Sequence, residues 1–127
     1  MNFNSIVQLH KQGKVSDVVM GYCIDKAMGS RRYNYDKMCA IKHPNVTSAH
    51  IDKALIAEQG DVRERAIKHP NVTTQHISKA LKDISFWVRM AAIGHQNATA
   101  EHIDKAQKDG NDWVRKTAMR IKKERNL

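Results

Sequence analysis

Four basic side chains recur at one fixed interval along this chain. They stand 26 residues apart, at Lys37, Arg63, Arg89 and Arg115. A guanidinium group presents planar, parallel N–H donors, so such a column suits bidentate contacts with phosphate groups. It suits equally an internal ladder, in which each arginine pairs with a neighbouring acid such as Asp61, Asp83 or Asp109. The residue types alone leave both interpretations open.

A largely aromatic column stands two positions before each of these residues, at Tyr35, Asp61, Trp87 and Trp113. Seven residues further along, about two helical turns and therefore on the same face, stand Lys42, Lys68, Gly94 and Arg120. An interleaved aromatic and basic face favours single-stranded nucleic acid, because its bases can stack on the aromatic rings and its phosphates are attracted to the basic side chains. The alternative is that Trp87 and Trp113 pack between units, as large aromatics beside an apolar helix face commonly do.

Histidines form two further columns, His43, His69 and His95, followed seven residues on by His50, His76 and His102. A metal site would need a converging ligand set, and no nearby cysteine completes one. Because repetition of the unit alone generates these columns, we expect structural histidines, the first set acting at helix C-termini. Cys23 and Cys39 lack a CxxC spacing and are expected to be reduced, buried thiols. The sequence therefore predicts neither metal nor cofactor.

The elements that carry these columns follow from the same period. Successive units begin at Ala40, Ala66 and Ala92 and cover 40–65, 66–91 and 92–117. Each predicts two short helices. The first is capped by the hydroxyl of Thr47, Thr73 or Thr99, and the second stops before His43-Pro44, His69-Pro70 or their equivalent.

Neither helix of a unit can bury its apolar face alone, so the units are expected to stack. The predicted fold is all-α, a right-handed helical-repeat solenoid of about three and a half 26-residue units, forming a single domain over residues 1–127. Residues 1–39 form a divergent leading unit whose first helix is about one turn longer. A capping helix is expected over 5–12, closed by Gly13. Residues 118–127 are expected to add a final helical turn or two that caps the core or frays.

The motifs AIKHPNVT, HIDKAL and the W-V-R step resemble the HEAT-like class, and specifically the leucine-rich variant repeats, over about Tyr35 to Met119. The chain also resembles small repeat proteins of large phages. This resemblance implies a scaffold that binds protein or nucleic acid. One founding member of the variant class carries an iron–sulfur cluster, but Cys23 and Cys39 fall short of the usual four ligands.

Composition narrows the class of partner. The net charge is +9 and the isoelectric point is about 9.8, which favours an acidic macromolecule. No stretch approaches the roughly 20 apolar residues of a membrane span, and the N-terminus lacks the apolar core of a signal peptide. We therefore expect a cytoplasmic protein with neither a membrane partner nor a small-molecule substrate.

The predicted function is a non-enzymatic binding module whose basic surface binds nucleic acid, with an adaptor or inhibitor that docks on an acidic protein as the alternative. The candidate binding residues are Arg31, Arg32, Lys37, Lys42, Arg63, Lys68, Trp87, Arg89, Trp113, Arg115, Arg120, Lys122 and Lys123.

A third hypothesis is an enzyme that resembles the HEAT-like DNA glycosylases, which hold DNA in a basic groove beside an acid. Only the pair Asp112 and Trp113 hints at this activity. The chain is much shorter than those enzymes, and it lacks a nucleophile elbow, a phosphate loop and an HExxH motif. No catalytic residue is predicted.

Overall fold

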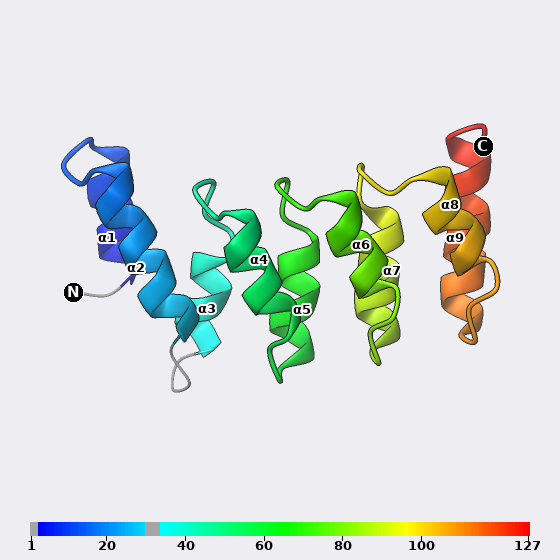
Figure 1. The fold of residues 1–127 in the computed structure, drawn as a ribbon. Helices are drawn as coiled ribbons and strands as arrows, with labels where there is room; N and C mark the ends of the chain where they lie inside the picture. Colours follow the sequence, from blue (N-terminus) through cyan, green and yellow to red (C-terminus); the bar gives the residue numbers. More distant parts are fainter. Residues whose placement is uncertain (1–2, 30–33) are drawn as a thin grey trace. The chain divides into compact units, whose positions relative to one another are not determined.

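The computed structural model describes residues 3–29 and 34–127, and within these ranges every regular element is an α-helix (Figure 1). The all-α prediction is confirmed to this extent. The helices fall into two compact units, Met1–Asn71 and Val72–Leu127, and each unit is described by itself.

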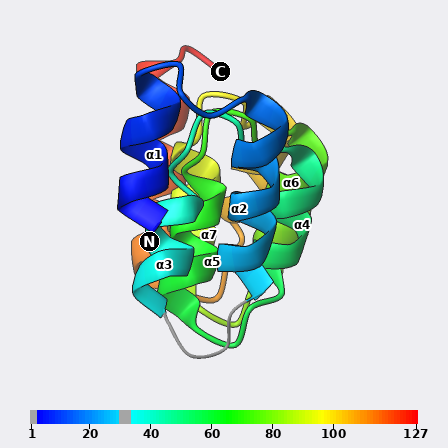
Figure 2. The same cartoon turned by 90° about the vertical axis from the view of Figure 1, so that its left-hand side faces the viewer.

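The first unit arranges its helices in two layers. In chain order they are α1 (Phe3–Lys11), α2 (Asp17–Gly29), α3 (Asn34–Ala40), α4 (Ser48–Leu55) and α5 (Gly60–Ile67). Helix α3 contacts both α1 and α5 in one layer, whereas α2 contacts α4 in the other (Figure 2). Contacts between α2 and α3 and between α4 and α5 join the layers into antiparallel hairpins.

The second unit repeats the hairpin twice. Its helices are α6 (Thr74–Ala80), α7 (Phe86–Gly94), α8 (Ala100–Ala106) and α9 (Asp112–Glu124). Helix α6 packs on α7, α8 packs on α9, and α7 contacts both α8 and α9. The second helices of the two hairpins therefore lie side by side, which places equivalent side chains of α7 and α9 next to each other.

The first helix of each 26-residue unit starts at the predicted threonine. Thr47, Thr73 and Thr99 are the N-caps of α4, α6 and α8, and each hydroxyl accepts a hydrogen bond from the backbone N–H three residues on. That third residue is always histidine, and its Nδ1 accepts the backbone N–H of the threonine at 2.9–3.0 Å. The pair forms a capping box in which imidazole takes the place of the usual glutamate or glutamine.

The core is built from the apolar residues that recur with the same period. Ile51, Ile77 and Ile103 on the first helices are fully buried, as are Ile67 and Ile93 on the second helices. Removing an isoleucine side chain from water stabilises a fold by roughly 1.5–3 kcal/mol. Burial of these isoleucines in each hairpin is therefore the main favourable contribution to the free energy of folding.

Both ends of the chain depart from the repeat. Helix α1 starts two residues earlier than expected, and Gly13 follows it with a φ of 71°. At the other end α9 runs unbroken to Glu124, so residues 118–124 extend a helix instead of fraying. Ile121 is buried, and the Arg125 guanidinium donates to the carbonyls of Ala98 and His95. The C-terminal segment therefore caps the second unit.

Candidate binding surfaces

The arginine column lies at the first turn of each second helix, and its guanidinium groups fold back onto the preceding loop. Nη1 of Arg63 donates to the carbonyl of Ala57 at 2.8 Å, six residues upstream. Nη1 of Arg89 donates to the carbonyl of Asp83 at 2.8 Å, also six residues upstream. Arg115 makes the equivalent bond to Asp109 at 2.7 Å. These side chains therefore close the turn between the two helices of a hairpin.

Arg89 also makes the ladder contact that the sequence suggests. Its Nε and Nη2 donate to the two carboxylate oxygens of Asp109 at 2.9 and 3.2 Å, and both side chains are more than four-fifths buried. Arg115 donates to Asp112 at 3.2 Å. Of the two open interpretations, the internal ladder is the one that the hydrogen bonds favour, because a phosphate contact at Arg89 would have to displace a bidentate carboxylate.

The tryptophan column lies on the surface. Trp87 and Trp113 are 58% and 66% exposed, which argues against the alternative that they pack between units. Each occupies the second position of its helix, and α7 and α9 pack together, so both rings lie on the same side of this layer. Trp87 contacts Phe86, with ring centroids 4.6 Å apart.

A basic stripe continues from Trp113 along α9. Lys116, Arg120 and Lys123 follow it at intervals of three and four residues, and all three are exposed. The Lys116 ammonium lies 5.9 Å from the centre of the Trp113 ring and 2.9 Å from a carboxylate oxygen of Asp112. This lysine, through its hydrogen bond, lowers the pKa of Asp112. The exposed ion pairs of this stripe are weak, and its cations remain open to an anionic partner.

The remaining predicted residues are dispersed. Lys42 and Lys68 are exposed just beyond the ends of α3 and α5, and Lys68 pairs with Glu64 at 2.9 Å. Lys37 is half-buried on α3, and Lys122 pairs with Asp104 of α8. Arg31 and Arg32 lie outside the described residues.

Sequence reasoning missed an exposed lysine column on the first helices. Within each unit taken by itself, a lysine follows the buried isoleucine of the first helix by two positions, and these residues are Lys26 and Lys53 in the first unit and Lys79 and Lys105 in the second. The repeated I-x-K-A motif was the available signal. In the second unit Lys82 and Lys108 are exposed beyond the ends of α6 and α8, which adds two cations near this column.

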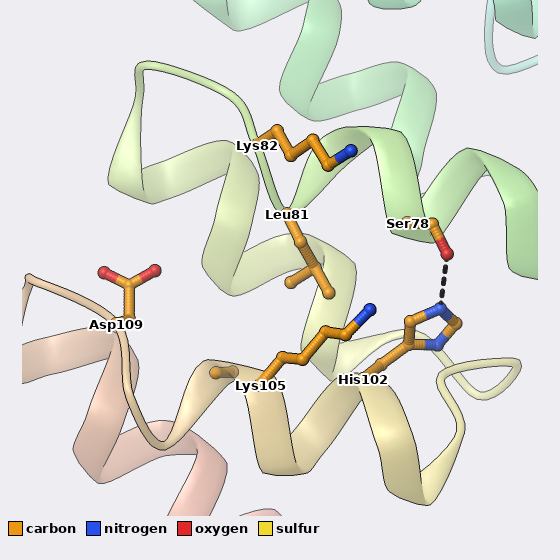
Figure 3. Close-up of a pocket in the computed structure, with 7 residues that line it drawn as sticks. Ser78, Leu81, Lys82, His102, Lys105 and Asp109 are labelled. Atoms are coloured by element: carbon orange, nitrogen blue, oxygen red, sulfur yellow. Dashed lines mark hydrogen bonds between the residues drawn. The ribbon is translucent and has the colours of Figure 1, made fainter.

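A pocket of about 190 Å³ lies between α6 and α8. Figure 3 shows the ammonium groups of Lys82 and Lys105 toward the end that holds Ser78 and His102, with Leu81 between the two lysines and Asp109 at the other end. Nε2 of His102 lies 2.8 Å from the Ser78 hydroxyl, a pairing that superficially resembles a nucleophile with its base.

The tautomer of His102 shows that this residue cannot act as the base that activates the Ser78 hydroxyl. Nδ1 accepts the backbone N–H of Thr99, so the neutral ring carries its proton on Nε2 and donates to Ser78. The Ser78 hydroxyl in turn donates to the Thr74 carbonyl. Burial lowers the pKa of His102, which keeps the ring neutral. A base for Ser78 would need a free lone pair on Nε2, and this hydrogen-bond chain provides none.

Both histidine columns form hydrogen bonds with the backbone, and for the first set these bonds differ from the predicted interaction with the helix C-terminus. His43, His69 and His95 each accept the backbone N–H two residues on, at 3.0 Å, which orders the turn after the helix. His50, His76 and His102 instead cap helix N-termini. Within residues 3–29 and 34–127 no three His, Cys, Asp or Glu side chains converge as a metal site, and Cys23 and Cys39 are free and half-buried.

No protein-family model, curated protein or solved structure matches this chain. The functional argument therefore depends on the geometry of its own residues. Among the described helices, none has both the length and the apolar character needed to cross a membrane.

Proposed function

We propose that this chain is a non-enzymatic α-solenoid, HEAT-like in its repeats, that binds nucleic acid through α7 and α9. The observation that carries the proposal is the exposure of two equivalent tryptophans on adjacent helices, continued along α9 by a stripe of cations. We define the α7/α9 face by Trp87, Trp113, Lys116, Arg120 and Lys123.

The chemistry of the α7/α9 face suits a flexible strand. Adjacent packed helices lie about 10 Å apart, so two rings at equivalent positions are spaced for bases that are not immediate neighbours in a strand. Stacking on an aromatic side chain contributes roughly 1–3 kcal/mol per base. Lys116, Arg120 and Lys123 extend about two to three helical turns from Trp113 and would follow the phosphate backbone.

The charge of the second unit supports the same partner. Residues 72–127 contain eleven Lys and Arg against six Asp and Glu. Within the α7/α9 face, Lys123 forms no ion pair with any described residue, and Lys116 and Arg120 pair only with exposed carboxylates. Long-range attraction of a polyanion follows from this excess.

The test is binding of fluorescent single-stranded and double-stranded oligonucleotides across a salt series. Trp87→Ala and Trp113→Ala should each weaken single-strand binding about tenfold or more, because each removes a stacking surface. Ile84→Ala is the matched control, since Ile84 is more exposed than either tryptophan and precedes α7. Lys123→Ala should reduce the log–log salt slope by about 1. Affinity that is insensitive to salt would refute the proposal.

An acidic protein is the second candidate, and one observation favours it. Met119 is 59% exposed although its equivalents Ile93 and Ile67 are fully buried, so an apolar side chain lies open on α9, three residues from Lys116 and four from Lys123 of the α7/α9 face. Trp and Arg are the commonest hot-spot residues of protein interfaces. If no oligonucleotide binds at moderate salt, a photo-crosslinking side chain at Met119 should trap a protein partner, and Trp113→Ala should abolish that crosslink.

A further inference from the structure

In the first unit, a hydrogen bond joins the two histidines that follow the second helices, and the first of these histidines has no equivalent bond of its own. Nε2 of His69 donates to the backbone carbonyl of His43 at 2.9 Å, and the two residues are one repeat apart. No equivalent residue precedes His43 by one repeat, because position 17 is Asp17 in another structural context. The Nε2–H group of His43 therefore lacks the backbone carbonyl acceptor that the Nε2–H group of His69 has.

His43 carries that donor in a defined tautomer. Its Nδ1 accepts the backbone N–H of Asn45 at 3.0 Å, so the proton of the neutral ring resides on Nε2. His43 is only 7% exposed, and Nε2 has no hydrogen-bond partner among the described residues. Nε2 keeps some contact with solvent, because no fully buried side-chain nitrogen or oxygen among the described residues lacks a partner. An accessible donor that no protein group uses is open to an acceptor on a ligand.

A pocket of about 410 Å³ lies beside this ring, between α1, α3 and the turn that follows α3. Phe3 and Val7 of α1 and Cys39 of α3 give it apolar walls, and Lys11 and Lys42 add two cations. This volume lies within the usual range for pockets that bind small organic molecules.

The charges around the pocket favour an anion. Neither Lys11 nor Lys42 forms an ion pair with a described residue. The nearby carboxylate of Asp17 does not line the pocket, and it is bound by His10 at 2.7 Å and by the Asn45 amide at 3.1 Å. Burial lowers the pKa of His43, and the neighbouring His10 and Lys11 lower it further, which favours the neutral ring as a donor.

We infer that this pocket, between α1 and α3, binds a small organic anion. Its charged group accepts a hydrogen bond from Nε2 of His43 and lies near Lys11 and Lys42. Its apolar part contacts Phe3 and Val7. The site is in the first unit and does not depend on the α7/α9 face.

The test uses the full chain with ¹⁵N-labelled histidine and follows the imidazole signals by NMR. Hexanoate and hexyl phosphate are the probes, hexanol is the neutral control, and inorganic phosphate is the control without an apolar part. The His43 signal is assigned by its loss in His43→Asn, whose side-chain oxygen still accepts from Asn45. We expect a saturable shift of that signal with hexanoate or hexyl phosphate and at least tenfold weaker binding of hexanol.

Two matched pairs of variants distinguish binding at this pocket from nonspecific attraction of the probe to a basic protein. Lys42→Met should weaken probe binding about threefold, whereas Lys68→Met, one repeat on, should leave it unchanged. His43→Asn, followed through the signal of His10, which also lines the pocket, should weaken probe binding about tenfold. His69→Asn removes a donor that is already used and should leave probe binding unchanged. Equal binding of hexanol and hexanoate, equal effects of the two lysine variants, or no saturable shift would each overturn the inference.

Discussion

The residue that recurs in the turns after α3, α5 and α7 is a histidine whose Nδ1 accepts a backbone N–H. The N–H donor in these turns belongs to an asparagine, and at the start of a first helix another histidine accepts the threonine N–H in the same way. Protonation would place a hydrogen on Nδ1, facing another N–H donor. The bonds that His43 and His102 accept require a ring without a proton on Nδ1, and burial lowers the pKa of both residues, which links the stability of the fold to pH.

This link predicts that the fold loses stability in mild acid. Burial lowers the pKa of His43 and of His102 below the ordinary value of 6.5, so the unfolded chain binds more protons than the folded one just below pH 6.5. Their contribution is complete above that pH and is lost as the pH falls through the folded pKa values. The Tm from circular dichroism should therefore drop by several degrees between pH 8 and pH 5.

The control for this pH dependence is His102→Gln. Glutamine at this position keeps a capping box with Thr99 but does not titrate, so the variant should show a smaller drop in Tm. Asp17 and Asp112 also have lowered pKa values, but their contributions are lost only below about pH 4, outside the tested range. Equal Tm values at pH 5 and pH 8 would contradict the histidine explanation.

The ladder contact of Arg89 gives a second prediction at this scale. Arg89→Ala leaves the largely buried Asp109 carboxylate without its bidentate donor and removes the bond to the Asp83 carbonyl. The free energy of unfolding should fall by about 2 kcal/mol, measured by urea denaturation. Lys122→Ala breaks an exposed pair with Asp104 and should cost less than about 1 kcal/mol. Equal losses in the two variants would show that burial of the pair is unimportant.

At the level of the helix, the N-cap threonines set where each first helix begins. Thr73→Ala removes the hydroxyl that accepts from His76 and should lower the free energy of unfolding by about 1 kcal/mol. Thr74→Ala, the same substitution at the exposed next position, should change it by less than about 0.5 kcal/mol. Urea denaturation of both variants makes the comparison, and an equal effect would exclude a capping role for Thr73.

The helices were predictable because their signals are local and repeat. Threonine caps, isoleucines three and four apart and prolines after the second helices each report on a few neighbouring residues, and α4 to α8 begin and end close to where these signals place them. The surface was harder to predict. Trp87 is next to the buried Val88 in the sequence. Periodicity gives the direction in which each side chain leaves the helix axis, but it does not say how wide the buried face of the helix is.

The arginine column illustrates the same limit. Its spacing identified a shared role, but the bond from Arg89 to a carbonyl six residues back depends on the shape of the loop between the helices. A guanidinium that satisfies a loop carbonyl and one that meets a phosphate have the same sequence pattern. The distinction required the tertiary structure.

At the scale of the whole molecule, the prediction of a single domain can be tested because two spectroscopic signals report on different parts of the chain. Both tryptophans lie in the second unit, whereas helices of both units contribute to far-UV circular dichroism. If the repeats stack as one solenoid, nearest-neighbour coupling should make the fluorescence and dichroism transitions coincide in urea. Ile51→Ala in the first unit should then lower the midpoint seen by tryptophan fluorescence, since it removes about 2–5 kcal/mol of stability. Ile103→Ala in the second unit is the matched variant and should shift both signals equally. A fluorescence midpoint that Ile51→Ala leaves unchanged would mean that the two units unfold independently, and the chain would then be two short repeat domains.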